Sequence, residues 1–122
     1  MRTFLLFVAS LATMAHVAPA TDIAHTISTQ PNVIVLFMRP ECPYCKFIDP
    51  IFNAIATRYG SSIRCVKINV NENPSAKDTY NFSSVPTVIY NKDGQEKLRH
   101  GSNNKTVTQE YMEQNIKTIY GQ

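Results

Sequence analysis

The chain has little cysteine, too little for a framework of disulfides. Its 122 residues include 3 cysteines, 4 glycines and no tryptophan. Small secreted domains that depend on disulfides for their stability are much denser in cysteine than this. Two of the three, Cys42 and Cys45, are separated by only two residues. In a chain with so few cysteines, such a close pair is more typical of a chemical reagent than of a structural crosslink.

The chain also lacks a strong charge imbalance. Charged residues make up 17% of it, and the formal net charge is +3. This charge is small and scattered, so we expect no nucleic-acid partner and no electrostatic attachment to a membrane surface. Repeats and low-complexity segments are absent as well. The length suits one domain with a single core.

No apolar run is long enough for a transmembrane helix. The most apolar segment covers about residues 4–15 and contains two hydroxyl residues, whereas a helix needs roughly 20 residues to cross a bilayer. Met1-Arg2 precedes it and Ala18-Pro19-Ala20 follows it, as in a secretory signal with its cleavage site. We expect a signal peptide at 1–20 and a periplasmic or secreted domain at 21–122, without stable membrane insertion after cleavage. An uncleaved anchor is the alternative.

The two close cysteines lie where a predicted strand passes into a predicted helix. The apolar run Val33–Met38 is typical of a buried strand, and residues 47–56 have the spacing of one apolar helix face. Cys42 is then near the helix N-terminus, where free amide groups and the helix dipole favour the thiolate. Cys45 lies one turn further on and deeper. The pattern predicts thiol–disulfide exchange, with Cys42 as nucleophile and Cys45 as resolving thiol.

Two alternatives to redox chemistry stay open for this pair. Cys-x-x-Cys can hold a metal ion, but a structural zinc site normally has four ligands. Cys65 and the three histidines form no matching second cluster in the sequence. The second alternative is a pair of buried, inert cysteines, although Pro43-Tyr44 at a helix start is a poor place to bury them. We expect neither a bound cofactor nor a metal, and we expect Cys65 to be a small buried apolar residue.

The other residues complete an α-β-α-β-α-β-β-α order. Asp93-Gly94 predicts a hairpin turn, Asn73 a helix N-cap and Gly60 a C-cap. Thr106 and Gln109 have the spacing of a capping box. A helix between the first two strands favours parallel pairing, so we expect an α/β domain with a mixed four-stranded sheet flanked by helices. The expected helices are 22–29, 43–59, 74–80 and 106–119, and the expected strands are 33–38, 63–70, 83–90 and 95–100.

Four separate stretches, in the same order, are similar to thioredoxins. Cys45–Ala56 resembles the active-site helix of that family, and Val66–Pro74 its next strand and turn. Ser84–Thr87 resembles its cis-proline loop, and Asp93-Gly94 its hairpin. The chain from Pro31 onwards is thus identified as a member of the thioredoxin-like superfamily. The first thioredoxin strand is expected to be missing, since too few residues precede that proline.

The resemblance implies a function and a set of site residues. It implies a thiol–disulfide oxidoreductase that acts on protein thiols or disulfides, together with a redox partner of unknown identity. If Pro86 is cis, the backbone of Val85 lies beside the cysteines, where a substrate strand can pair with it. Pro43 and Tyr44 are the other expected substrate contacts, although an exposed aromatic without a role is an equal alternative for Tyr44.

The chain departs from thioredoxins in ways that keep other functions open. Pro43-Tyr44 between the cysteines resembles glutaredoxins, and Glu41 stands where thioredoxins have tryptophan. Leu36 takes the place of the family's buried acid, so we expect Lys67, which accompanies that acid, to lack a partner. The alternatives are a glutathione-dependent, glutaredoxin-like enzyme and a metal-binding protein on the thioredoxin fold. The direction of exchange is not decided by these features.

Overall fold

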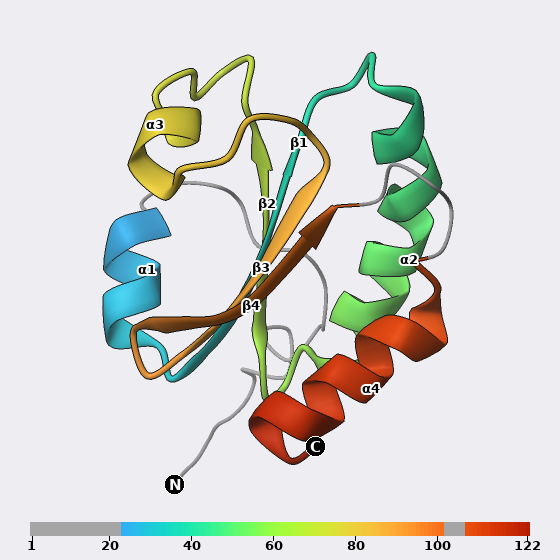
Figure 1. Cartoon of the computed structure of the whole chain (residues 1–122). Helices are drawn as coiled ribbons and strands as arrows, with labels where there is room; N and C mark the ends of the chain where they lie inside the picture. Colours follow the sequence, from blue (N-terminus) through green and yellow to red (C-terminus); the bar gives the residue numbers. More distant parts are fainter. Residues whose placement is uncertain (1–22, 102–106) are drawn as a thin grey trace, which may run out of the picture.

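The computed structural model describes residues 23–101 and 107–122, which form a sheet with helices on both faces (Figure 1). The strand order is β2-β1-β3-β4. β1 is parallel to β2 and antiparallel to β3, and β3 and β4 form an antiparallel hairpin. The expected mixed sheet is thereby confirmed. The helices are α1 (Ile23–Thr29), α2 (Pro43–Tyr59), α3 (Ala76–Tyr80) and α4 (Gln109–Tyr120), and the strands are β1 (Asn32–Met38), β2 (Arg64–Asn69), β3 (Thr87–Lys92) and β4 (Gln95–Gly101).

The central strand β1 divides the core into two halves. Its side chains alternate between the faces of the sheet, and residues 33–37 are all almost fully buried. Ile34 and Leu36 pack in the cluster that α2 and α4 cover, whereas Val33, Val35 and Phe37 pack in the cluster beneath α1 and α3 (Figure 1). Burial on both faces explains why the sequence of β1 is an uninterrupted apolar run. In the described part of the chain, no strand precedes α1.

Helix α2 begins directly after Cys42, which is its N-cap. Pro43 suits the first turn because its missing N–H would have no partner there. The helix continues through Pro50, and Ile48, Phe52 and Ile55 are completely buried. Gly60 caps the C-terminus, as expected, but with φ of −62° it is right-handed and makes no use of glycine's freedom.

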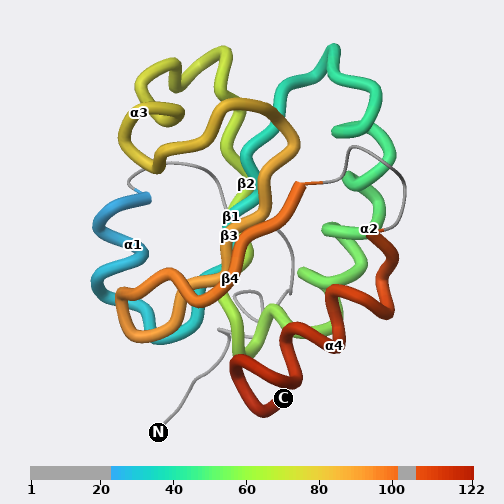
Figure 2. The backbone as a smooth tube through the Cα atoms, in the orientation of Figure 1, coloured from blue at the N-terminus to red at the C-terminus, as the bar shows by residue number. Residues whose placement is uncertain are grey.

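The topology brings two loops to one end of the sheet. β1 leads into the cysteine turn, and β3 begins at Thr87, just after Pro86. Because the strands are antiparallel, with Phe37 opposite Thr87 in the register, the end of β1 lies beside the start of β3. Figure 2 shows the loop that enters β3 passing close to the start of α2. Residues more than 40 positions apart, such as Cys42 and Val85, meet at this end (Cys42 Sγ to Val85 O, 3.6 Å).

The hairpin and α4 confirm some of the predicted local signals and correct others. Asp93 and Gly94 have φ of 53° and 81°, as the predicted turn requires. The cap of α4, however, is Thr108, whose Oγ1 accepts from the Tyr111 amide at 3.1 Å, so the predicted capping box is wrong. Thr106 lies outside the described residues. Tyr111, in the first turn of this helix, is 41% exposed.

Helix α3 is shorter than predicted, and Asn73 does not cap it. The helix begins at Ala76 after Ser75, whose side chain makes no capping bond. The Asn73 amide instead donates to the Asn69 carbonyl at 3.0 Å, within the turn that follows β2. An Asn side chain readily makes such local bonds to the backbone, which compete with a capping role.

The C-terminal end of α3 is tied to the edge strand β4. The Arg99 guanidinium donates to the carbonyls of Tyr80 at 2.9 Å and Asn81 at 2.8 Å. It is also paired with Glu96. Tyr80 and Asn81 end α3, whose last carbonyls have no partners within the helix. Arg99 thus anchors the segment that leads towards Pro86. None of the helices in the described residues is both long and apolar enough to span a membrane.

Candidate active site

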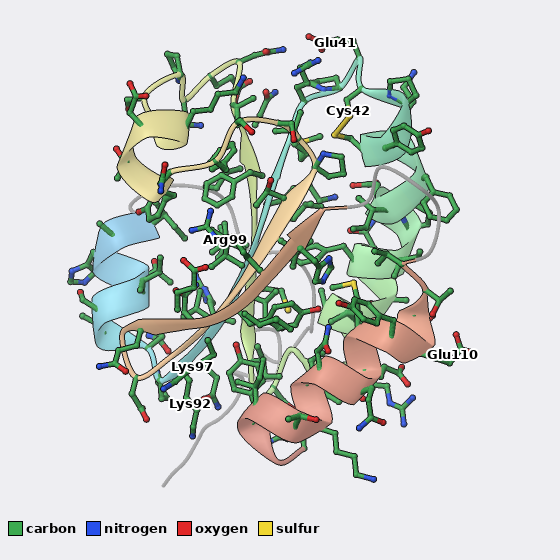
Figure 3. All side chains as sticks on the ribbon, viewed as in Figure 1. Glu41, Cys42, Lys92, Lys97, Arg99 and Glu110 are labelled. Carbon is green, nitrogen blue, oxygen red and sulfur yellow. A yellow bond between two sulfur atoms is a disulfide. The ribbon has the colours of Figure 1, made fainter. Side chains whose placement is uncertain are left out.

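Cys42 and Cys45 form a disulfide at the start of α2, with their Cα atoms 5.1 Å apart. Figure 3 shows the disulfide at the end of the helix, with Glu41 pointing away from it. The Cys45 amide donates to the Sγ of Cys42 at 3.1 Å, the geometry in which an N-cap side chain accepts from the first turn. When the disulfide is reduced, this amide and the dipole of α2 stabilise negative charge on that sulfur.

Exposure does not distinguish the two sulfurs as the sequence suggested. Cys42 is 4% exposed and Cys45 is 2% exposed, so both residues are buried. Their surroundings differ instead. The Sγ of Cys42 lies 3.6 Å from the carbonyl oxygen of Val85, and the Val85–Pro86 peptide bond is cis. Cys45, bonded to that sulfur, also lines a pocket beside α2.

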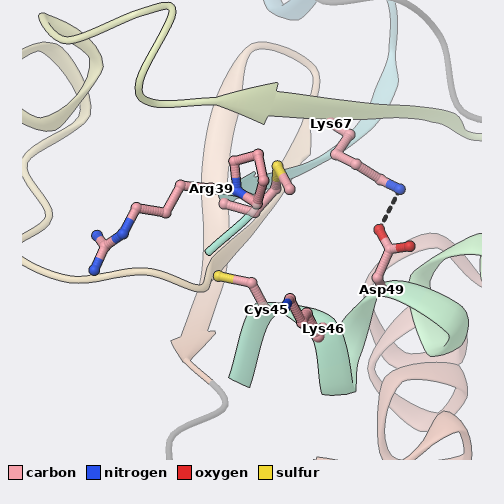
Figure 4. Close-up of a pocket in the computed structure, with 7 residues that line it drawn as sticks. Arg39, Cys45, Lys46, Asp49 and Lys67 are labelled. Atoms are coloured by element: carbon pink, nitrogen blue, oxygen red, sulfur yellow. Dashed lines mark hydrogen bonds and ion pairs between the residues drawn. The ribbon is translucent and has the colours of Figure 1, made fainter. Parts of the chain in front are cut away.

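The pocket beside Cys45 has a volume of about 320 Å³ and lies between α2 and the ends of β1 and β2 (Figure 4). Asp49 on α2 and Lys67 on β2 face each other across it and form an ion pair. Lys67 also donates to the Asn53 side chain at 3.1 Å. The expectation that Lys67 lacks a partner is therefore wrong. The pocket is lined by Met38, Arg39, Pro40, Cys45, Lys46, Asp49 and Lys67.

The sheet register explains why Lys67 turns to the helix. Leu36 and Lys67 are partners in the parallel pair β1–β2 and lie on the same face of the sheet. Leu36 is completely buried and carries no charge. A lysine at this position needs an anion, and Asp49 supplies it from the helix that covers this face. Sequence reasoning missed Asp49, although its spacing of one helical turn from Cys45 was a usable signal.

The predicted substrate contacts lie on both sides of Cys42. Val85 and Pro86 form one side, at the loop that enters β3. Pro43 and Tyr44 form the other, where they line a mostly apolar surface hollow together with Lys46 and Phe47. Tyr44 is 38% exposed, so its ring is accessible from solvent. The structure therefore places Val85 beside the Cys42 sulfur and Pro43 and Tyr44 in the first turn of the helix that Cys42 caps.

Glu41, next to Cys42, is held by its neighbours. The Asn71 amide donates to both of its carboxylate oxygens, at 3.2 and 3.0 Å. Arg39 lies 3.6 Å from the same carboxylate. The hydrogen bonds from Asn71 and the charge of Arg39 lower the pKa of Glu41, so it stays ionised beside the cysteines. Its side chain is exposed, and within the described part of the chain it makes its hydrogen bonds to Asn71 and not to either sulfur.

Cys65 and His100, the other thiol and imidazole in the sheet, are engaged elsewhere. Burial raises the pKa of the Cys65 thiol to about 12, as expected for a small apolar core residue. His100 contacts the Tyr90 hydroxyl at 2.9 Å, and burial lowers its pKa. Within residues 23–101 and 107–122, no three His, Cys, Asp or Glu side chains are grouped to hold a metal ion.

The chain is similar to known thioredoxins in sequence and in structure. The thioredoxin family model matches residues 15–118. Thioredoxin 1 of Synechococcus elongatus is 34% identical over 85 residues, which cover 70% of this chain and 79% of that protein. The thioredoxin of Porphyra purpurea is 35% identical over 82 residues, covering 67% and 77%. The structure of a thioredoxin variant from Halobacterium salinarum superimposes with a TM-score of 0.69 at 20% identity, covering 84% of this chain and 86% of that one, which is a likeness of fold.

Proposed function

Since the chain belongs to the thioredoxin family, we propose that it directs its thiol–disulfide oxidoreductase activity at proteins outside the cytoplasm. The observation that carries the exchange activity is the position of Cys42. Its sulfur is the N-cap of α2, receives an amide hydrogen bond and lies beside the backbone of Val85. A sulfur in this position forms a stabilised thiolate, and an extended substrate segment can pair with the backbone beside it.

Exchange proceeds in two displacements at sulfur. In the reducing direction, the Cys42 thiolate attacks one sulfur of a substrate disulfide, and the other leaves as a thiolate. Cys45, deprotonated, then attacks the Sγ of Cys42. The bond between Cys42 and the substrate breaks, and its electron pair leaves with the substrate sulfur. The protein ends with the Cys42–Cys45 disulfide that the structure contains.

The substrate is held by the residues that flank Cys42. The carbonyl of Val85 accepts a backbone amide from an extended substrate segment, so affinity comes from the main chain and is tolerant of sequence. Pro43 and Tyr44 contact the substrate from the other side, where the exposed ring covers apolar surface. Export is supported by the composition of residues 1–20, which have the charge, apolar stretch and small residues of a signal peptide.

The roles of the two cysteines are tested by single substitutions. Cys42→Ser should abolish reduction of a protein disulfide such as those of insulin, because no nucleophile remains. Cys45→Ser should accumulate a mixed disulfide through Cys42, visible by mass spectrometry and reversed by dithiothreitol. Cys65→Ala is the matched control and should keep its activity. If alkylation of the reduced protein at mildly acidic pH modifies Cys45 before Cys42, the assignment is wrong.

The alternatives to this function receive less support. The relatives described above are thioredoxins, so the glutathione-dependent alternative has no support from them. Among the described residues, no third ligand is grouped with the cysteines, so the metal-binding alternative would have to complete its site from a second molecule or from the rest of the chain. We therefore put forward no second function.

A further inference from the structure

Cys45 and Asp49 line the same pocket, and from this we infer that Asp49 accepts the proton that Cys45 releases when it resolves a mixed disulfide. The inference rests on the proposed roles of Cys42 and Cys45. Asp49 is the single carboxylate among the described residues that line this pocket. It follows Cys45 by one helical turn, so both side chains lie on the same side of α2.

The need for a proton acceptor comes from the burial of Cys45. Its residue is 2% exposed, and burial favours a neutral thiol over a thiolate. The neutral thiol is a poor nucleophile towards the bond between Cys42 and the substrate. Its proton must therefore leave as the sulfur attacks. The Cys42 sulfur has the Cys45 amide and the carbonyl of Val85 beside it. Neither group is a base that could take this proton.

The carboxylate of Asp49 is held at the edge of the pocket by two contacts. Lys67 contacts Oδ1, and the amide of Asn53 donates to Oδ2 at 3.4 Å. The side chains of Asp49 and Lys67 are 38% and 23% exposed, so water reaches the carboxylate. The pocket that both residues line has a volume of about 320 Å³, which is room for several water molecules. Figure 4 shows both residues on the same stretch of α2, with Lys67 reaching in from β2.

The proposed step balances in protons and electrons. The Cys45 proton passes through pocket water to the Asp49 carboxylate, while the Cys45 sulfur forms its bond to Sγ of Cys42. The bond between Cys42 and the substrate sulfur breaks, and the substrate leaves as a thiolate. Asp49 then returns the proton to solvent or to the departing sulfur. Lys67 is a positioning residue in this step, since it holds the carboxylate and exchanges no proton.

The test uses an aromatic disulfide, dithiobis-nitrobenzoate, which releases a coloured thiolate in each displacement. Attack by Cys42 releases the first equivalent, and resolution by Cys45 releases the second. With the reagent in excess, the slower phase reports resolution alone. The full chain is used in a Cys65→Ala background, so that only two thiols react. Asp49→Asn, Asp49→Glu and Lys67→Met are compared with Glu113→Gln, which removes a carboxylate from the Arg58–Glu113 pair between α2 and α4.

The pH profile separates a proton acceptor from a structural residue. With Asp49 present, the resolution rate should change by less than about threefold between pH 6 and pH 8, because the Cys45 proton passes to a group of the protein and the rate does not follow the thiolate fraction in solution. In Asp49→Asn it should fall at least about tenfold at neutral pH and rise about tenfold per pH unit, following the thiolate fraction. Asp49→Glu should restore the flat profile. Lys67→Met should be slower but still flat, since the carboxylate remains.

The failures of this inference and of the proposed function are distinguishable. If Asp49→Asn resolves at a rate within about twofold of Glu113→Gln, with the same pH dependence, then Asp49 does not accept the proton. A steep profile in Asp49→Glu as well would have the same meaning. If the parent protein releases no second equivalent, or if Cys45→Ser still releases two, the roles of the cysteines are wrong before Asp49 is in question.

Discussion

Cys65, a buried thiol that takes no part in exchange, makes the stability of the fold depend on pH. Burial raises the pKa of Cys65 from the ordinary 9.0 to about 12, so the fold favours the neutral form. Burial also raises the pKa values of Tyr90 and Tyr120, which belong to the same core cluster. In the unfolded chain all three release their protons at lower pH. The stability that they contribute is complete below about pH 9 and is lost as pH rises towards 12.

We therefore expect an alkaline loss of stability that Cys65 shares with the two tyrosines. Once a group ionises in the unfolded chain, it lowers the free energy of unfolding by at most about 1.4 kcal/mol per pH unit. Cys65→Ala should flatten the decline in the free energy of unfolding between about pH 9 and pH 10, even though the variant is less stable at neutral pH. Urea denaturation of the oxidised protein measures this. Parallel declines in both proteins would mean that the thiol is not protected by the fold.

At the scale of elements, the connection between β4 and α3 is made by one side chain. Arg99 donates to the carbonyls of Tyr80 and Asn81 and pairs with Glu96, so it closes the end of α3. Arg99→Met should lower the free energy of unfolding by about 1–2 kcal/mol, because these carbonyls lose charged donors. It should also increase amide hydrogen exchange in α3.

The control for this substitution lies on the same strand. Lys97, whose ammonium reaches Gln95 at 3.4 Å, makes no comparable link in the described structure, so Lys97→Met should stay within about 0.5 kcal/mol. Arg99→Lys should recover little, since an ammonium cannot reproduce the fork of the guanidinium. Equal effects of the Met substitutions at 97 and 99 would show that α3 does not depend on this link.

The sequence predicted the elements better than their ends. β1 and α2 have unambiguous patterns, an apolar run and a helical apolar face, and the structure confirms both. The start of α4 was harder because Thr106 and Thr108 are both good N-caps. In the structure the hydroxyl of Thr108 accepts from the Tyr111 amide and caps the helix. Which of two nearby threonines makes this bond depends on the path of the chain into the helix, which a local pattern does not contain.

Local sequence patterns also predicted only part of the candidate active site. Cys42 and Cys45 could be found because their spacing is itself the signal, and Val85-Pro86 because it resembles a known loop. The Asp49–Lys67 pair joins residues 18 positions apart, on a helix and a strand whose relative placement follows from the register of β1 with β2. Only the assembled fold shows that Lys67 has an anion within reach.

At the scale of the whole molecule, the first twenty residues bear on where the domain works. Residues 1–20 predict a cleaved signal, and they lie outside the described part of the chain. When the full chain is expressed in a bacterium, the exported protein should begin at Thr21, which N-terminal sequencing can establish. Exported protein that still begins at Met1 would indicate a tethered enzyme. Ala18→Leu should block cleavage, because the peptidase requires small residues there.

The two edges of the sheet have a consequence for how the protein behaves when concentrated. β2 and β4 are the edge strands, and each presents backbone groups that another chain could join. β4 is largely exposed and carries Glu96, Lys97 and Arg99, while β2 carries the exposed Arg64. Charges of this kind oppose edge-to-edge association of like chains. The residues that contribute least to the redox site thus guard the molecule against fibrous self-assembly, and their neutralisation would shorten its lifetime in solution before it altered its chemistry.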